Sequence, residues 1–218
     1  MNVIKGLITK DILQLKSYKK TLIVFIMIFA LTSISGEGGI GNILAIMLTL
    51  GFGMFSMASF NYDEFNKADR YILTLPLTKK EVVLSKYILV IGSTVMGSII
   101  GIMLSYIVTF AMNKQVPNIE EIISVGLGGL LGIGIIEAIQ IPCVYKWGAE
   151  KGRIQMVILT ALLGVIIFVG AKANIQLPAN NILNIVNTFL PLIFIGLIII
   201  IYYISYKVAY KIYDKKEI

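Results

Sequence analysis

Residues 87–112 read YILVIGSTVMGSIIGIMLSYIVTFAM and contain no charged side chain. A helix needs roughly 20 mostly apolar residues to cross the hydrocarbon core of a bilayer, and this stretch is longer than that. It therefore predicts a transmembrane helix, and the same pattern recurs along the rest of the chain.

Five further apolar stretches lie on either side of this one. They cover residues 20–35, 40–60, 119–145, 154–171 and 188–206. The chain is 57% hydrophobic and only 14% charged, whereas soluble domains carry about 25% charged residues. Because so little charge cannot cover a water-soluble surface, lipid must contact much of the outside. We therefore predict an all-α integral membrane protein, with residues 1–218 forming a single domain of six transmembrane helices.

The basic residues indicate which side of the membrane is cytoplasmic. All 19 lysines and arginines except Lys114 and Lys172 lie at the two ends of the chain or in the loops after the second and fourth stretches. Cytoplasmic loops carry an excess of Lys and Arg, so with an even number of spans both termini are predicted to be cytoplasmic. The abundance of Lys, Ile and Asn suggests an AT-rich bacterial genome, and hence a bacterial cell membrane.

Residues 1–20 have the pattern of an amphipathic helix that lies in the inner membrane interface. Apolar residues recur at helical spacing on one face, and lysines lie opposite, where they would meet anionic headgroups. Asp11 interrupts the apolar face. We favour a local ion pair between Asp11 and a neighbouring lysine, and a contact with a distant part of the protein is the alternative.

The composition excludes several kinds of chemistry. The chain has one cysteine, Cys143, and no histidine, so an intrachain disulfide and a Ser-His-Asp or Cys-His nucleophile are excluded. Zinc and blue-copper sites are not expected either. No G-x-x-x-x-G-K-[ST] motif is present to hold the phosphates of a nucleotide. We expect no cofactor or metal on this chain and no covalent chemistry.

The longest predicted cytoplasmic loop, residues 61–77, carries charges and aromatic residues on a short helix. We expect Asn61 to cap this helix, Asp63 and Lys67 to form an i, i+4 ion pair, and Pro76 to end it. Thr78 and Glu81 then have the spacing of a capping box that starts the next helix. The short helix is either an ordinary solvated loop helix or a docking helix for a cytoplasmic partner.

Four stretches resemble the ABC-2-type permeases, most closely their small stand-alone branch that includes bacterial exporters of phenol-soluble modulins and other membrane-active peptides. They are LITKDIL at 7–13, YDE at 62–64, LPLTKKEVVLSKY at 75–87 and IPCVYKWGAEKGR at 141–153. The resemblance implies that two permease chains, identical or paralogous, pair with two separate ABC ATPase subunits that hold ATP and Mg. It also implies that the loop helix couples to the ATPase through Tyr62, Asp63, Glu64, Phe65, Lys67, Asp69 and Arg70.

Small residues mark close helix packing. In the third stretch they recur every four positions, and two more lie in the fourth: Ser93, Gly97, Gly101 and Ser105, then Gly128 and Gly132. Small side chains let helices approach closely in lipid, where packing drives association. We favour static packing within the chain, with a sliding surface used in transport as the alternative.

Glu137 is the outstanding charge within a predicted span, and Gln140 lies one turn away. A charge there costs at least about 2.5–3.5 kcal/mol unless it is paired, hydrated or protonated. Both residues are candidates to line a substrate cavity and contact a cationic, amphipathic substrate. A hydrogen-bonded acid that holds two helices together is equally compatible with the sequence. Residues 172–190 are predicted to form an outer loop with a short helix.

The resemblance, together with Glu137, therefore implies the membrane permease of an ATP-driven exporter of amphipathic peptides or lipid-like compounds. A proton- or ion-coupled secondary transporter is an alternative, although such carriers tend to have several ionisable groups in their spans and repeated halves. A membrane immunity or scaffold protein that transports nothing is another.

Overall fold

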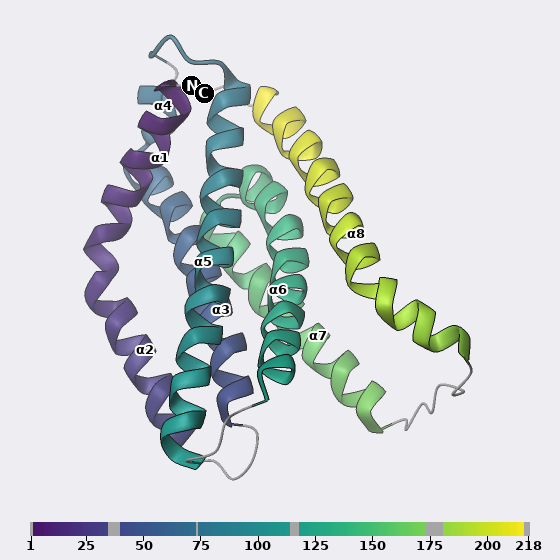
Figure 1. The fold of residues 1–218 in the computed structure, drawn as a ribbon. Coiled ribbons are helices and arrows are strands. Elements are labelled where there is room, and N and C mark those ends of the chain that lie inside the picture. The colour runs from purple at the N-terminus through teal and green to yellow at the C-terminus, as the bar shows by residue number, and fades with distance from the viewer. Residues whose placement is uncertain (1, 35–39, 73, 114–117, 173–180, 216–218) are drawn as a thin grey trace.

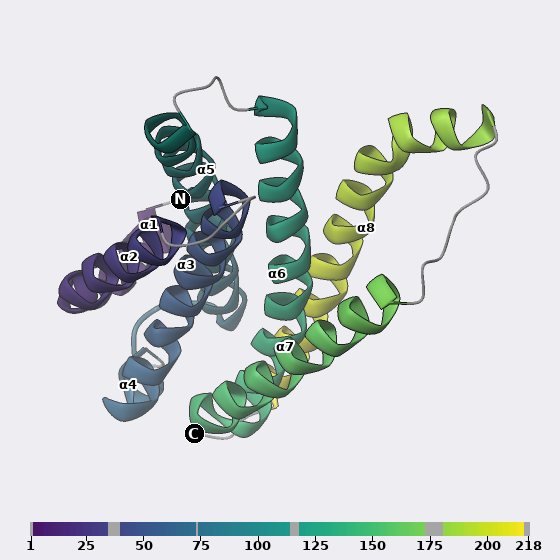
Figure 2. The same ribbon diagram turned by 90° about the horizontal axis from the view of Figure 1, so that it is seen from below.

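The computed structural model describes residues 2–34, 40–72, 74–113, 118–172 and 181–215, and within them the chain is helical without any strand. The elements are α1 (Asn2–Leu15), η1 (Lys16–Tyr18), α2 (Lys19–Ile34), α3 (Ile40–Phe65), α4 (Ala68–Ile72), α5 (Lys79–Asn113), α6 (Ile119–Trp147), α7 (Ala149–Lys172) and α8 (Asn181–Asp214). Figure 2 shows α6 between two groups, with α1, α2, α3 and α5 on one side and α7 and α8 on the other.

Each of the six predicted spans falls on one of the long helices. Among the described residues, three helices are long and apolar enough to cross a membrane: Leu44–Phe65, Lys79–Ala111 and Ile119–Trp147. The protein is therefore a helical membrane protein, while the total of six spans and the cytoplasmic side of both termini stay predictions. The start of α1 and the end of α8 lie at the same end of the bundle, as an even number of spans requires (Figure 1).

The centre of the bundle is formed by α3, α5 and α6, which approach closely at glycines. A Cβ added at Gly101 would lie 2.8 Å from the carbonyl oxygen of Ala45, so α5 and α3 meet backbone to backbone. Gly97 faces α3 in the same way, and Ser105 is fully buried. A Cβ at Gly128 or Gly132, by contrast, would meet no atom within 4 Å, so the packing role of these two glycines stays a prediction.

The first helix packs on the bundle through one edge. Leu7 and Asp11 are buried against α3 and α5, whereas Ile12 and Leu13 are more than half exposed. From η1 the chain continues into α2 with a bend (Figure 1). The interfacial position predicted for residues 1–20 stays a prediction.

The loop between the second and third predicted spans differs from the expectation. Helix α3 continues to Phe65, so Asn61 lies inside the helix and does not cap a new one. The helix ends where Lys67 adopts a positive φ of 50°. The capping box is confirmed, because Thr78 N–H donates to Glu81 Oε2 at 2.9 Å and Glu81 N–H donates back to Thr78 Oγ1 at 3.4 Å.

The predicted outer loop, residues 172–190, lies partly outside the described residues, which leave out 173–180. From Asn181 onward the backbone is one continuous helix, α8. The separate short helix expected there is therefore the start of α8.

Candidate functional site

Four charged side chains from three helices form a buried ion network at the end of the bundle where α1 begins. Lys86 on α5 contacts Asp63 Oδ2 at 2.6 Å and Asp11 Oδ1 at 2.9 Å. Lys10 contacts Asp63 Oδ1 at 2.8 Å and Asp11 Oδ1 at 3.2 Å. The Lys86 side chain is only 6% exposed, and its ammonium also donates to Ser59 Oγ at 3.1 Å.

The network is balanced, since its two lysines face two aspartates and the formal charges cancel. A buried charge without a partner is costly, so each of these groups depends on the others. The contact of Asp11 with Lys86 shows that Asp11 reaches a distant part of the protein in addition to its neighbour Lys10. The predicted pair of Asp63 with Lys67 is wrong, because Lys67 is exposed beyond the end of α3 while Asp63 points into the bundle.

Lys10 is the member of the network nearest to solvent. Burial alone would lower the pKa of its ammonium, but the hydrogen bond to Asp63 and the charges of Asp11 and Asp63 outweigh burial and raise the pKa. Lys10 therefore remains charged at neutral pH, as the balance of the network requires.

Glu64, next to Asp63, points the other way and holds the start of α7. Its Oε2 accepts a hydrogen bond from the backbone N–H of Ala149 at 2.5 Å, where the positive end of the helix dipole favours a carboxylate. Gly148 precedes α7 with φ 90° and ψ 165°, a conformation that is essentially restricted to glycine. A Cβ at Gly148 would lie 2.7 Å from Glu64 Oε1, so a side chain there would also displace the carboxylate.

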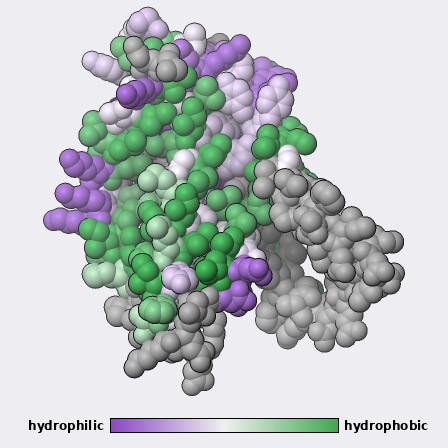
Figure 3. Space-filling model, in the orientation of Figure 1, coloured by the Kyte–Doolittle hydropathy of each residue, from purple (hydrophilic) through white to green (hydrophobic). Residues whose placement is uncertain are grey.

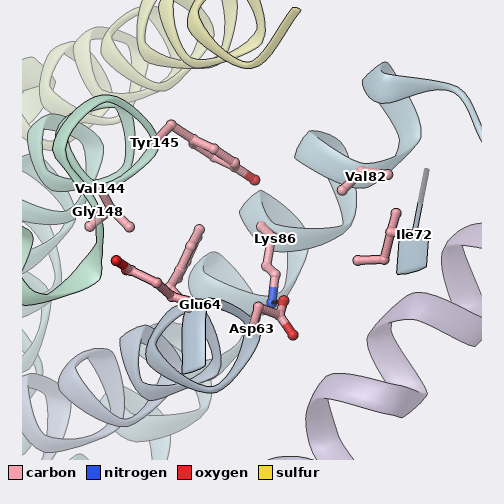
Figure 4. A pocket seen from close by; sticks show the side chains of 9 residues that line it. Asp63, Glu64, Ile72, Val82, Lys86, Val144, Tyr145 and Gly148 are labelled. Atoms are coloured by element: carbon pink, nitrogen blue, oxygen red, sulfur yellow. Dashed lines mark ion pairs between the residues drawn. The ribbon is translucent and has the colours of Figure 1, made fainter. Parts of the chain in front are cut away.

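The network and the Glu64 contact enclose a cavity of about 100 Å³. Figure 4 shows Asp63 pointing to Lys86 on one side of it and Glu64 pointing to Gly148 on the other. The residues that line it come from α3, α4, α5 and α6 and the turn that follows: Phe60, Asp63, Glu64, Ile72, Val82, Lys86, Val144, Tyr145 and Gly148. The motif stretches 7–13, 62–64, 75–87 and 141–153 therefore meet at one end of the bundle.

Aromatic side chains stand out from the corner between α3 and α4. Phe65 is 86% exposed and Tyr71 is 76% exposed, whereas Tyr62 is half-buried against Tyr18 with 5.3 Å between ring centroids. An open groove of about 360 Å³ lies beside this corner, and its lining includes Tyr62, Phe65 and Glu150. We call Tyr62, Phe65, Tyr71 and this groove the corner surface.

The predicted coupling residues thus divide into two sets. Asp63 is buried and Glu64, although exposed, reaches the backbone of α7, so both have contacts with other helices, while Phe65 and Lys67 face outward. Asp69 and Arg70 belong to α4, and their side chains lie outside the described part of the structure.

Glu137 and Gln140 lie deeper in the bundle and are both buried. The Glu137 carboxylate accepts hydrogen bonds from Thr94 Oγ1 at 2.8 Å and from Tyr202 Oη at 3.2 Å, so it connects α5, α6 and α8. Gln140 donates to the carbonyl oxygen of Gly152 on α7 at 3.3 Å. In this state both act as links between helices, and a role in a substrate cavity stays a prediction.

Several partners were not predicted from the sequence, namely Ser59, Lys86, Thr94 and Tyr202. Lys86 lies in the stretch 75–87 and among the basic residues that mark the cytoplasmic side, but neither pattern identifies its partners, and the others lie within apolar stretches without a distinctive spacing. Among the described residues, no group of three or more Cys, Asp or Glu side chains is placed to hold a metal ion.

A family model described as ABC-2 family transporter protein matches residues 6–214. No curated protein and no solved structure matches the chain. The match covers almost the whole chain and includes both the ion network and the corner surface.

Proposed function

Because the chain belongs to the ABC-2 family of transporter proteins and is the membrane permease of an ABC transporter, we propose that it exports amphipathic peptides or lipid-like compounds from a bacterial cell. As a transport component it is not itself catalytic, and it works with an ABC ATPase. In this proposal ATP and Mg are held by two ATPase subunits, which pair with two permease chains.

We assign the ATPase contact to the corner surface. The observation that carries this assignment is the exposure of Phe65 and Tyr71 at the end of the bundle predicted to be cytoplasmic. Large aromatic side chains are enriched at protein interfaces and among the residues that contribute most to binding. The corner comprises the end of α3 and the short helix α4, within the segment to which the family resemblance assigns the coupling role.

The contacts of Asp63 and Glu64 with other helices explain how movement at the corner would reach the rest of the bundle. Asp63 ties the end of α3 to α1 and α5, and Glu64 ties it to the start of α7. An ATPase that displaces Phe65 therefore also displaces Asp63 and Glu64. Through these two residues the movement reaches α1, α5 and α7. This arrangement suits a permease with two conformations of the helix bundle, in which the ATPase binds one conformation more tightly and so shifts the equilibrium toward it.

The assignment is tested by co-purification of the ATPase with Phe65→Ala and Tyr71→Ala variants. We expect ATPase binding to weaken at least roughly 30-fold, as for an interface residue worth about 2 kcal/mol. The thermal stability of the permease alone should not change, because both side chains are exposed. Tyr203→Ala, which removes an exposed aromatic side chain from α8, is the matched control. Undiminished ATPase binding by both corner variants would refute the assignment.

Export itself is tested in inside-out vesicles that contain the permease with its ATPase. We expect ATP-dependent uptake of a cationic amphipathic peptide or a lipid-like compound, and no uptake driven by an ion gradient alone. Uptake that needs an ion gradient and no ATPase would contradict the proposal.

Glu137 tests the nature of the cargo separately. The substrate can reach its carboxylate only if α5, α6 and α8 separate, because the side chain has no exposed surface in this state. Glu137→Gln keeps the size and an accepting oxygen while replacing the ionisable carboxyl group with a neutral amide. If export of a cationic peptide and cargo-stimulated ATP hydrolysis are unchanged in this variant, Glu137 does not contact the cargo.

A further inference from the structure

The carboxyl group of Glu137 is enclosed by three neighbouring helices. Thr94 Oγ1 on α5 lies 2.8 Å from both carboxyl oxygens, and Tyr202 Oη on α8 lies 3.2 Å from Oε2. On α3, a Cβ added at Gly53 would overlap Oε1, so the backbone of α3 closes the third side. The Glu137 side chain has no exposed surface. Figure 3 shows hydrophobic side chains over most of the face formed by α5 and its neighbours, which suits contact with lipid rather than water.

No cation of the described residues lies within ion-pair distance of this carboxyl group. The helices packed against α6 carry their described charged side chains toward the end of the bundle where α1 begins, the closest along each helix being Asp63 on α3, Lys86 on α5, Lys151 on α7 and Lys207 on α8. Lys86, the buried cation among them, lies about 12 Å from Thr94 along α5 at 1.5 Å per residue. Tyr202 is the titratable side chain in contact with Glu137, and Tyr87 follows, with 6.4 Å between the two ring centroids. A buried carboxyl group without a cation beside it is stable as the neutral acid.

The contacts of Thr94 indicate the same protonation state. Thr94 Oγ1 lies 2.8 Å from the carbonyl oxygen of Val90 as well as 2.8 Å from each Glu137 carboxyl oxygen, but a hydroxyl group has one hydrogen to donate. If Glu137 is ionised, three acceptor oxygens must share this hydrogen. If Glu137 is a carboxylic acid, it donates its own hydrogen to Thr94 Oγ1, Thr94 donates to Val90, and Tyr202 donates to Oε2. Each hydroxyl hydrogen is then used once and each oxygen has a partner.

We propose that Glu137 is a proton-binding site, which holds one proton as a neutral carboxylic acid while α5, α6 and α8 are packed together. When these helices separate, Glu137 loses its hydroxyl partners and meets water, to which it passes the proton. The negative charge of Glu137 therefore arises only in the separated state. Proton binding in the packed state needs neither the cargo nor the ATPase, so its test does not depend on the proposed function.

Infrared spectroscopy of the purified permease at neutral pH tests the proposal, because a carboxylic acid and a carboxylate absorb at different carbonyl-stretching frequencies. We expect the wild type to show the band of a protonated carboxyl group, and Glu137→Gln to lose this band. Glu120→Gln, which removes an exposed carboxyl group at the start of α6, is the matched control and should keep the band.

A second variant tests the hydrogen bonds around the acid. Tyr202→Phe removes only the hydroxyl group that donates to Glu137 Oε2. A carbonyl group that loses its hydrogen bond absorbs at a higher frequency, so we expect the band to move upward in this variant. Tyr203→Phe, which alters an exposed side chain next to Tyr202, is the control and should leave the band in place.

The pH dependence of stability gives a measurement that is independent of the spectrum. An unfolded glutamate loses its proton above its ordinary pKa of about 4.3, whereas the folded permease retains the proton of Glu137, so stability falls as pH rises. Between about pH 5 and about pH 7, the Tm of the wild type should therefore fall relative to that of Glu137→Gln.

Absence of the band from the wild type at neutral pH would overturn the proposal, because Glu137 would then be ionised in the packed state. A band that stays in Glu137→Gln would also overturn it, since another group would hold the proton. The same conclusion would follow from a band that does not move in Tyr202→Phe, or from parallel plots of Tm against pH for the wild type and Glu137→Gln.

Discussion

Replacing Lys86 with methionine tests the ion network most sharply, because Lys86 is its most deeply placed cation. The substitution keeps an unbranched side chain of similar length and removes the ammonium. It takes away the contacts with Asp11 at 2.9 Å and Asp63 at 2.6 Å, together with the hydrogen bond to Ser59. Two carboxylates then share Lys10 alone, and the cluster carries an uncompensated negative charge.

The expected cost follows from this burial. Removing one partner of a buried ion pair destabilises a protein by about 3–5 kcal/mol, because the remaining charge stays buried without compensation. For a chain of this size, 1 kcal/mol corresponds to roughly 2–4 °C in Tm, so Tm should fall by roughly 6–20 °C. Adding Asp11→Asn restores the charge balance and leaves the pair of Lys10 with Asp63. The double variant should therefore be about 1–3 kcal/mol more stable than the sum of the single effects predicts.

The assay is thermal unfolding of the purified permease in one detergent, for both single variants and the double variant. Lys80→Met, which removes an exposed lysine from the same helix, is the control and should change Tm by only a few degrees. If Lys86→Met unfolds within about 2 °C of the wild type, or if the two single effects simply add, the network does not hold the corner as we describe.

Three further predictions concern the same bundle. Gly148→Ala should lower the free energy of unfolding by about 1–3 kcal/mol, because alanine does not tolerate φ 90° with ψ 165° and its Cβ displaces Glu64; thermal unfolding at wild-type Tm would contradict this. Gly101→Leu should lower the free energy of unfolding by at least about 1–3 kcal/mol, because the leucine side chain forces α5 away from α3. Gly164→Leu should leave Tm unchanged in the same thermal unfolding experiment. Equal effects of the two substitutions would show that α5 and α3 are not in close contact at Gly101. Since the pKa of Lys10 is raised in the folded state, its stabilisation is complete below the ordinary lysine pKa of about 10.4 and is lost as pH rises through the raised value. When Tm is measured at increasing alkaline pH, it should therefore fall less steeply for Lys10→Gln than for the wild type. Parallel plots of Tm against pH for the two proteins would refute this.

Local patterns predicted much of the fold. Each apolar stretch of sufficient length coincides with a helix, and the capping box of Thr78 with Glu81 forms as its spacing indicates. These features depend on residues within one or two turns of each other, so sequence spacing is enough to identify them. Asn61 shows the limit of such rules: although Asn is a good helix cap, α3 continues past it, because Asp63 and Glu64 are held by residues far away in the sequence.

The buried network could not be assembled from spacing alone. Lys10 and Asp63 are 53 positions apart, and Asp11 and Lys86 are 75 positions apart. The sequence did carry one clue, because Asp11 interrupts an apolar face and a buried carboxylate requires a cation. Which lysine meets it depends on how α1 packs against α5, and that information is tertiary. The same holds for Glu137, whose partners Thr94 and Tyr202 come from two other helices.

The proposed function depends most on the ATPase contact that we assign to the corner between α3 and α4. Site-specific photo-cross-linking tests it directly, with a photoreactive phenylalanine analogue placed at Tyr71 or, for comparison, at Val165 on the exposed face of α7. We predict a cross-link to the ATPase subunit from position 71 and none from position 165. A cross-link from position 165 without one from position 71 would show that the ATPase does not bind at this corner.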